Sequence, residues 1–505
     1  MRRFALLLLK KVSPAAAVEG WVAGVPALRE LEQELPWFEH MMLGISTELR
    51  THVSSGVKFR AYLGAGVSAA DMVSDSVMVS NYYAMGDADT ANGLLAMIAA
   101  NLVWQALVVV VQTRGLGERK WKARMYEIGC VVSFMKPGVE AFRVASGAEQ
   151  ENGAAFTPLI EMMITKCGEL FFEAIPGLIL QLVALLRAEE WSRSALVSIA
   201  ISTASSAMTA TTMFWDMDTD PSSRARNPKW LGIVPDLGRE LAFATVFFMC
   251  ACQIMAKTGA TALLAVTNMG WLVKYVIADH AVHFLYRVSR RDMIVYAPVP
   301  KAASYAIAPL QRIILKVLID FTGSPHFRLP PNGGGAYWLF SLVMSQASVF
   351  AGVYLYGSGS GRVEERVLWT GAIALSGAWL ATFACFVGGI AVPKYRHTIW
   401  SLTSGRQYIQ DIFLKGESDE AKFGIFRRNL LLWDGDIGDE VRAWVAKEWK
   451  KWQEEKPAWF KVERVPDQFI PKAELGALGC NRERRGSAAR SVRESVAQEV
   501  KTTTG

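Results

Sequence analysis

Long apolar segments, separated by short polar connections, recur along most of this sequence. A helix needs about 20 mostly apolar residues to cross a bilayer, because each residue rises ~1.5 Å and the hydrocarbon core is ~30 Å thick. We therefore expect an all-α, polytopic transmembrane bundle with about eight spans. The predicted spans are residues 61–85, 91–112, 159–186, 193–214, 240–257, 260–286, 336–356 and 366–391.

The overall composition favours the same class of protein. Of the 505 residues, 51% are hydrophobic, which is more than an ordinary pair of soluble domains can bury. The 54 Lys and Arg residues exceed the 47 Asp and Glu residues by 7, and they cluster beside apolar segments instead of forming one stripe. This distribution is typical of membrane topology and argues against a nucleic-acid partner.

The positions of the cations also predict the orientation of the chain. Short loops that are rich in Lys and Arg resist translocation and stay cytoplasmic. Such loops follow the second span, flank the fifth and follow the sixth, whereas the connections at 86–89, 257–259 and 357–365 are short and carry fewer cations. Eight spans with both termini in the cytoplasm satisfy this pattern. The basic residues used here are Arg114, Arg119, Lys120, Lys122, Arg124, Arg224, Arg226, Lys229, Arg239, Arg287, Arg290 and Arg291.

Two further segments are too interrupted to be full spans. Residues 125–145 contain a Lys-Pro-Gly sequence around Pro137, and residues 303–320 contain Arg312 and Lys316. If each segment begins and ends on the cytoplasmic side, it forms a re-entrant or interfacial helix. A helix that lies on the protein surface is an equal alternative.

The sequence divides into four regions by composition. After Pro393 it becomes charged and contains several Trp residues, and its last part has the composition of a disordered tail. Near the start, the apolar stretch within residues 1–10 is shorter than a usual signal sequence, so we expect no cleaved secretory signal, while an organellar presequence stays open. The predicted regions are an N-terminal cytoplasmic region (1–60), a transmembrane domain (61–392), a soluble, mainly helical cytoplasmic domain (393–475) and a disordered tail (476–505).

One predicted helix of the soluble domain is rich in Trp. Its apolar face has lysines beside it, a combination that suits a membrane surface or a partner protein, although packing inside its own domain is a further alternative. In the tail, Ser487 follows Arg484-Arg485-Gly and is a candidate phosphorylation site. The residues of the Trp-rich helix are Ile437, Val441, Trp444, Val445, Lys447, Glu448, Trp449, Lys450, Lys451 and Trp452.

Acidic side chains inside the predicted spans are the strongest candidates for function, because an ionisable group within a bilayer is costly unless it is paired or wetted. Asp71 and Asp75 lie four residues apart in the first span and therefore on one helical face. In the third span, polar residues recur every fourth position, and small or hydroxyl residues in the fourth span either extend this polar track or allow close helix packing. The stripe of the third span is Glu161, Thr165, Glu169, Glu173, Gly177 and Gln181.

Three other features of these spans complete the candidate site. Within the third span, Pro176 removes a backbone donor and is followed by Gly177, and we expect a helix kink at this Pro-Gly pair. Lys166, one turn from Glu169, and Lys274 in the sixth span are the candidate counter-charges. We interpret Asp71, Asp75, Glu169, Glu173 and Gln181 as a polar path through the membrane.

Motifs for catalysis and for cofactor binding are absent from the sequence. There is no GxxxxGK[ST], GxSxG or HExxH sequence, and the cysteines show no CxxC spacing. Asp279, His280 and His283 resemble a metal-binding pattern but lack a third well-spaced ligand, so a hydrated helix end is the preferred interpretation. We expect no metal, no cofactor and no enzymatic activity.

Two motifs resemble the XK-related family of membrane proteins. The first is Asp71-Met-Val-Ser-Asp75-Ser-Val-Met-Val-Ser-Asn-Tyr-Tyr83, which is similar to the first-helix pattern of that family. The second is Glu169-Leu-Phe-Phe-Glu173-Ala-Ile-Pro176-Gly-Leu-Ile-Leu-Gln181, in which Gly177 replaces the usual Gln. The resemblance covers roughly residues 61–215. It implies eight spans with two membrane-inserted half helices, cytoplasmic termini, a plasma-membrane location and phospholipid scrambling, although an endomembrane or an organelle stays open.

The residues themselves leave three functional hypotheses. A polar path would lower the cost of moving a phospholipid headgroup between leaflets without an energy source. The same acids could instead bind cations or protons in a channel or a coupled transporter. A third hypothesis is a membrane-anchored scaffold that acts through its C-terminal domain.

Overall fold

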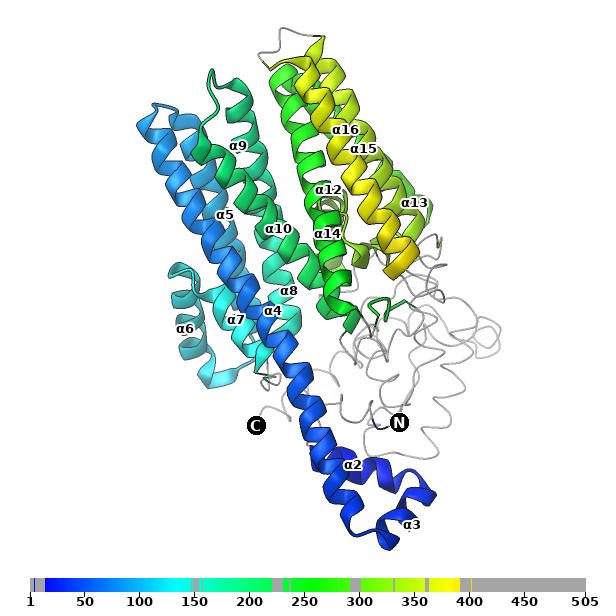
Figure 1. Ribbon diagram of the computed structural model, residues 1–505. Coiled ribbons are helices and arrows are strands. Elements are labelled where there is room, and N and C mark those ends of the chain that lie inside the picture. Colours follow the sequence, from blue (N-terminus) through cyan, green and yellow to red (C-terminus); the bar gives the residue numbers. More distant parts are fainter. Residues whose placement is uncertain are drawn as a thin grey trace, which may run out of the picture. The chain divides into compact units, whose positions relative to one another are not determined.

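The computed structural model shows an all-helical protein over the residues that it describes, with no strand among them (Figure 1). This part of the fold prediction is confirmed. The described residues are 4, 14–146, 148, 154–156, 158–219, 230–235, 238–290, 301–329, 332–358, 363–390 and 401.

Within the part of the chain that the structure describes, six helices are long and apolar enough to cross a membrane. The chain therefore has the architecture of an integral, multi-pass membrane protein. Most predicted spans agree with these helices to within a few residues at each end. The six are α5 (Ala88–Gln112), α8 to α9 (Pro158–Arg187), α10 (Arg193–Thr219), α12 (Arg239–Thr267), α15 (Gly335–Gly357) and α16 with its π-helical extension (Glu365–Ile390).

The first predicted span, 61–85, is the C-terminal half of a 48-residue helix, α4 (Trp37–Ala84). Such a helix is roughly 72 Å long at ~1.5 Å per residue, more than twice the thickness of a bilayer core. Its N-terminal end packs with α2 (Pro14–Ala23) and α3 (Pro26–Glu34) (Figure 1). The predicted boundary at residue 60 thus falls inside one continuous helix. The apolar core of this small module contains Phe4, Val18, Trp21, Val22, Phe38 and Met42.

The predicted turn at 257–259 does not form, so the predicted division between the spans 240–257 and 260–286 is wrong. Helix α12 continues through this segment, and the hydroxyls of Thr258 and Thr261 bond to carbonyls one turn earlier. Lys257 is tolerated because its ammonium lies 4.8 Å from the ring centroid of Tyr275. The break comes instead at Asn268, whose backbone is extended, and α13 (Met269–Ser289) follows.

The two interrupted segments are both helical. Residues 125–145 belong to a hairpin of α6 (Lys120–Val132) and α7 (Lys136–Ala145), whose turn places Phe134 at a positive φ of 60°. Pro137 lies in the first turn of α7, where a missing N–H leaves no hydrogen bond unmade. Residues 303–320 lie in α14 (Lys301–Thr322), which is followed by the short 3-10 helix η3 (Pro325–Arg328).

Two compact units divide the chain. The first comprises residues 1–284 and 314–402, and the second comprises residues 285–313 and 403–505. Of the second unit, the described residues are the end of α13 and the beginning of α14. The predicted tail, the Trp-rich helix and Ser487 lie outside the described residues, as does the predicted soluble domain apart from Ser401.

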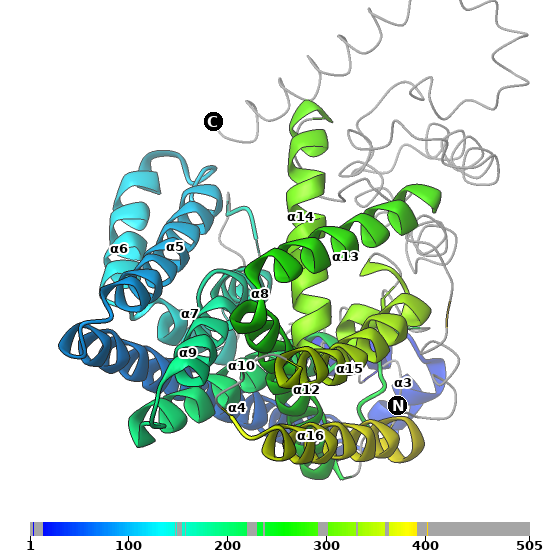
Figure 2. The same ribbon diagram turned by 90° about the horizontal axis from the view of Figure 1, so that it is seen from above.

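Within the first unit, α12 contacts α9, α10, α15 and α16 (Figure 2). Small residues allow part of this packing: Ala256 and Ala260 are buried, and a Cβ on Gly352 would lie 3.3 Å from the carbonyl oxygen of Ala260. On the other side, α4 packs on α5, α7 and α10, and α5 packs on α8 and α9. The interface of α4, α5, α8, α9 and α10 contains the predicted site.

A glycine in α8 makes one of the closest helix contacts. The indole of Trp104 on α5 donates to the carbonyl of Ile164 (3.1 Å) and lies against Gly168. A Cβ at Gly168 would approach that ring to 1.8 Å, so only glycine is accommodated without movement. The same indole also packs near the ring of Phe172, with 5.4 Å between centroids.

We predict that Gly168→Ala lowers the stability of the protein by about 1–3 kcal/mol, because Trp104 must leave its position. Thermal unfolding of the purified protein in detergent measures this loss. Gly129→Ala is the matched control, since no atom lies within 4 Å of a Cβ there and the substitution favours the helix. Equal unfolding temperatures for the two variants would contradict the proposed contact.

Candidate functional site

The third predicted span is interrupted by a π-helical turn. Between α8 (Pro158–Glu169) and α9 (Ile175–Arg187), residues Leu170–Ala174 form this turn, and the N–H of Ile175 donates to the carbonyl of Leu170, five residues earlier. Pro176 has no N–H to continue the ordinary ladder, which accounts for the position of the irregularity. The turn contains Glu173, one of the predicted path residues.

The five predicted path residues are buried at one helix interface. From α4, Asp71 accepts a hydrogen bond from Ser202 of α10 (2.6 Å), and Asp75 accepts one from Gln181 of α9 (2.9 Å). All five have at most 8% of their surface exposed. We call this set, Asp71, Asp75, Glu169, Glu173 and Gln181, the acidic column.

Two more contacts join the acidic column to its neighbours. Ser68 of α4 donates to one oxygen of Glu169 (3.1 Å), and Asn101 of α5 donates to Glu173. Gln105, one turn further along α5, donates to Asn101 (3.4 Å). The column therefore brings together side chains from α4, α5, α8, α9, α10 and the π-helical turn.

The partners of the four carboxylates are hydroxyl and amide groups. Among the described residues, none of the four carboxylates makes an ion pair. Burying an ionised carboxylate inside a membrane without a counter-charge costs free energy, and such acids are usually functional. The acidic column is accordingly the candidate site of this protein.

The two predicted counter-charges do not pair with the acidic column. Lys166 is buried, but its ammonium has no hydrogen-bond partner among the described residues, and it makes no ion pair with Glu169. Lys274 is exposed on α13 and lies over the ring of Trp271, 5.1 Å from the centroid. Lys274 thus lies on an exposed face of α13 and makes no ion pair with the acidic column.

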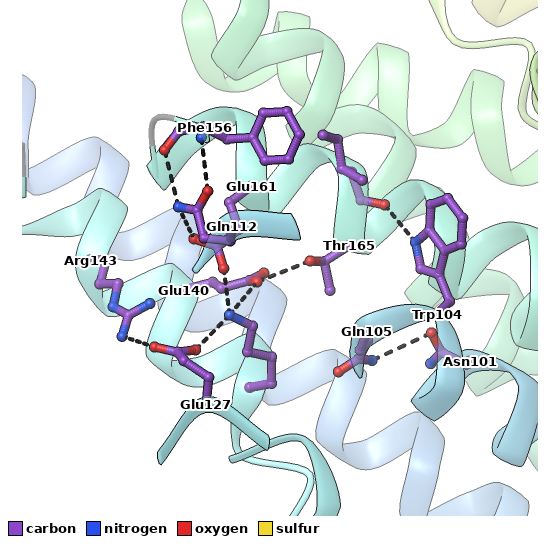
Figure 3. Close-up of polar contacts among 12 residues, drawn as sticks. Asn101, Trp104, Gln105, Gln112, Glu127, Glu140, Arg143, Phe156, Glu161 and Thr165 are labelled. Atoms are coloured by element: carbon purple, nitrogen blue, oxygen red, sulfur yellow. Dashed lines mark hydrogen bonds and ion pairs between the residues drawn. The ribbon is translucent and has the colours of Figure 1, made fainter. Parts of the chain in front are cut away.

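A second group of charges lies next to the acidic column and includes Glu161 of α8. The ammonium of Lys136 contacts Glu127 (2.7 Å), Glu140 (3.1 Å) and Glu161 (2.6 Å), and Arg143 pairs with Glu127 (Figure 3). We call Glu127, Lys136, Glu140, Arg143 and Glu161 the Lys136 cluster. It fixes the α6–α7 hairpin to α8.

Gln112 and Thr165 extend this cluster (Figure 3). Gln112 of α5 donates to Glu161 (2.9 Å) and exchanges hydrogen bonds with the backbone of Phe156. Thr165, one turn after Glu161, donates to Glu140 (2.9 Å). Burial alone would lower the pKa of Lys136, but the surrounding glutamates raise that pKa above its ordinary value, so the lysine stays charged.

Sequence reasoning identified Glu161 but missed its partners. Glu127 and Glu140 lie in the interrupted segment, which sequence reasoning treated only as a membrane-inserted or surface helix. The detectable signal was the amphipathic pattern of α7, where Lys136 and Glu140 are four residues apart and share a face. That pattern indicates a buried polar contact only once the hairpin is known to pack on α4 and α8.

Another buried polar network lies around α14. Lys316 contacts Asp279 (2.7 Å) and Asp320, and Gln253 of α12 donates to the backbone carbonyl of Asp320 (2.7 Å). The expected hydrated helix end at Asp279 is thus partly buried and ion-paired. His283 contacts the hydroxyl of Tyr337 (2.6 Å), and the described residues contain no group of three or more His, Cys, Asp or Glu that could hold a metal.

Comparison with known proteins adds no family to this description. No protein-family model matches the chain, and no curated protein matches it. Its fold and site therefore define a class only: an all-helical, multi-pass membrane protein with a buried acidic column.

We predict that Lys136→Met lowers stability by about 3–5 kcal/mol, because three buried glutamates lose their shared counter-charge. The unfolding temperature of the purified protein in detergent measures the effect. Lys122→Met is the matched control, since Lys122 is exposed on α6 and its replacement should change stability by less than about 0.5 kcal/mol. An unchanged unfolding temperature in Lys136→Met would show that the cluster does not hold the hairpin.

Proposed function

We propose that this protein is an energy-independent phospholipid scramblase of the XK-related type. The observation that carries the proposal is the acidic column, in which Asp71, Asp75, Glu169 and Glu173 are buried with neutral partners. A polar interface within an apolar bundle lowers the cost of taking a charged headgroup out of water. The acyl chains of such a lipid would stay in the surrounding bilayer.

The proposed topology has eight spans. Six are the helices that are long and apolar enough to cross a membrane, and the other two are the C-terminal half of α4 and helix α13. The α6–α7 hairpin and α14 would be the two re-entrant or interfacial elements. Both termini would be cytoplasmic, and the plasma membrane is the location that the family resemblance favours.

Exposed side chains of the hairpin support its contact with lipid. Trp121, Met125, Val132 and Met135 each expose more than 60% of their surface, and Lys122 is exposed beside Trp121. Trp and Lys together are typical of the membrane interface. The Lys136 cluster would then hold an interfacial hairpin next to the end of the column.

A second candidate function is an ion channel or a cation- or proton-coupled transporter. It is favoured by the same observation, since carboxylates without a counter-charge are suitable ligands for a passing cation. The two functions differ in what crosses the membrane, so one preparation of vesicles can separate them.

The test uses purified full-length protein in liposomes that contain fluorescent phospholipids. We predict that the wild-type protein exchanges lipid between leaflets without ATP and that Asp75→Asn with Glu173→Gln lowers the rate at least about tenfold, the effect of losing one or more charged contacts. Ion flux is recorded on the same vesicles. The control is Glu189→Gln with Glu190→Gln, which changes two acids on an exposed connection.

The outcomes separate the candidate functions. Ion flux without lipid exchange would replace the scramblase by a channel or transporter. If neither lipid nor ions move, the proposal of a transport function fails for the isolated protein, and the scaffold hypothesis gains weight. Loss of exchange in the control variant as well would show that the acidic column is not the cause.

A further inference from the structure

Lys166 and Glu169 present two unused polar groups one helical turn apart. The ammonium of Lys166 has no hydrogen-bond partner among the described residues, and neither does the second oxygen of Glu169. Lys166 is 6% exposed and Glu169 is 8% exposed. The structure thus contains a buried cation and a buried carboxylate oxygen, close in sequence, that do not satisfy each other.

The surroundings place both groups beside the same face of α4. A Cβ on Gly64 would lie 3.9 Å from the ammonium of Lys166, and Ser68, one turn later, donates to the first oxygen of Glu169. Asp71 and Asp75 continue this face, because positions 64, 68, 71 and 75 have the three- and four-residue spacing of one helical stripe. Lys166 therefore lies at the end of the acidic column, next to a position without a side chain.

A buried ammonium without a partner costs several kcal/mol, so a ligand that supplies an anion would be bound favourably. Phosphate is a strong acceptor for a charged donor. A free carboxylate oxygen nearby is suited in turn to a quaternary or primary ammonium. The two groups together match a ligand that carries both charges.

We propose that Lys166 and Glu169 form a binding site for a zwitterionic phospholipid headgroup. Lys166 binds the phosphate, and the free oxygen of Glu169 contacts the ammonium of choline or ethanolamine. This proposal assigns zwitterionic phospholipids to the acidic column as its substrate class, and it therefore rests on the proposed function. It also makes a claim about binding that does not require lipid movement.

Binding is measured by the retention of lipids on purified full-length protein in an uncharged detergent. The probes are phosphatidylcholine, phosphatidylglycerol, a diacyl trimethylammonium lipid and diacylglycerol, which carry both charges, phosphate only, ammonium only and neither. Wild-type protein should retain phosphatidylcholine most strongly. Equal retention of diacylglycerol would overturn the proposal without any variant, so the test stands even if a variant does not fold.

Variants then assign the two charges. Lys166→Met should lower the retention of phosphatidylcholine about tenfold, the loss expected for one charge-assisted contact, whereas Lys166→Arg should preserve it. Glu169→Gln should remove the preference for phosphatidylcholine over phosphatidylglycerol. Lys274→Met is the matched control, because Lys274 is an exposed membrane-helix lysine. Unchanged retention in Lys166→Met would refute the phosphate site.

Inorganic phosphate distinguishes the two sources of the anion. If the wild-type protein binds inorganic phosphate as tightly as phosphatidylcholine, and Lys166→Met loses both, the site recognises phosphate alone and the lipid-specific proposal is refuted. If the vesicle assay shows no lipid exchange while retention depends on Lys166, the scramblase proposal fails and the binding site stands. If exchange depends on Asp75 and Glu173 while Lys166→Met retains lipid normally, only the binding site fails.

Discussion

The cost of placing carboxylates in an apolar bundle is the constraint on which this structure depends. One stripe of α8 and the following π-helical turn contains Glu161, Glu169 and Glu173. These three carboxylates differ in their partners. Glu161 has a full positive charge at 2.6 Å from Lys136. Glu169 and Glu173 have only a hydroxyl and an amide as partners. This stripe therefore runs from a carboxylate that is paired with a lysine to carboxylates that have only neutral partners.

The Lys136 cluster explains why a short hairpin has a defined position. Helices of 13 and 10 residues, such as α6 and α7, are too short to be stable alone in water. The contact of Lys136 with Glu127 joins α7 to α6, its contact with Glu161 joins the hairpin to α8, and Gln112 joins the same point to α5. We expect this cluster to favour one arrangement of the hairpin, because each displaced charge would remain buried without a partner.

Sequence reasoning predicted the helical class, most spans and the burial of Asp71 and Asp75, because hydropathy and helical spacing are local properties. It failed where tertiary contacts determine a helix boundary or the partner of a charged side chain. Lys257-Thr-Gly259 looks like a turn by composition, yet the helix continues because Tyr275 and internal threonine hydrogen bonds accommodate it. The ion pair between Lys136 and Glu161 could not be predicted, since the two residues are 25 positions apart and only the folding of the hairpin brings them together.

The network of Lys316, Asp279 and Asp320 differs from the acidic column in how completely its groups are bonded. Around α14, Lys316 lies between Asp279 and Asp320, and both oxygens of Asp320 are bonded. The amides of Gln253 and Gln346 complete that network by bonding to each other. In the acidic column, by contrast, buried atoms of Lys166, Glu169 and Gln181 lack partners among the described residues. A network whose groups are all bonded stabilises one conformation, whereas under the proposed function the unused groups of the acidic column would exchange partners with a passing headgroup.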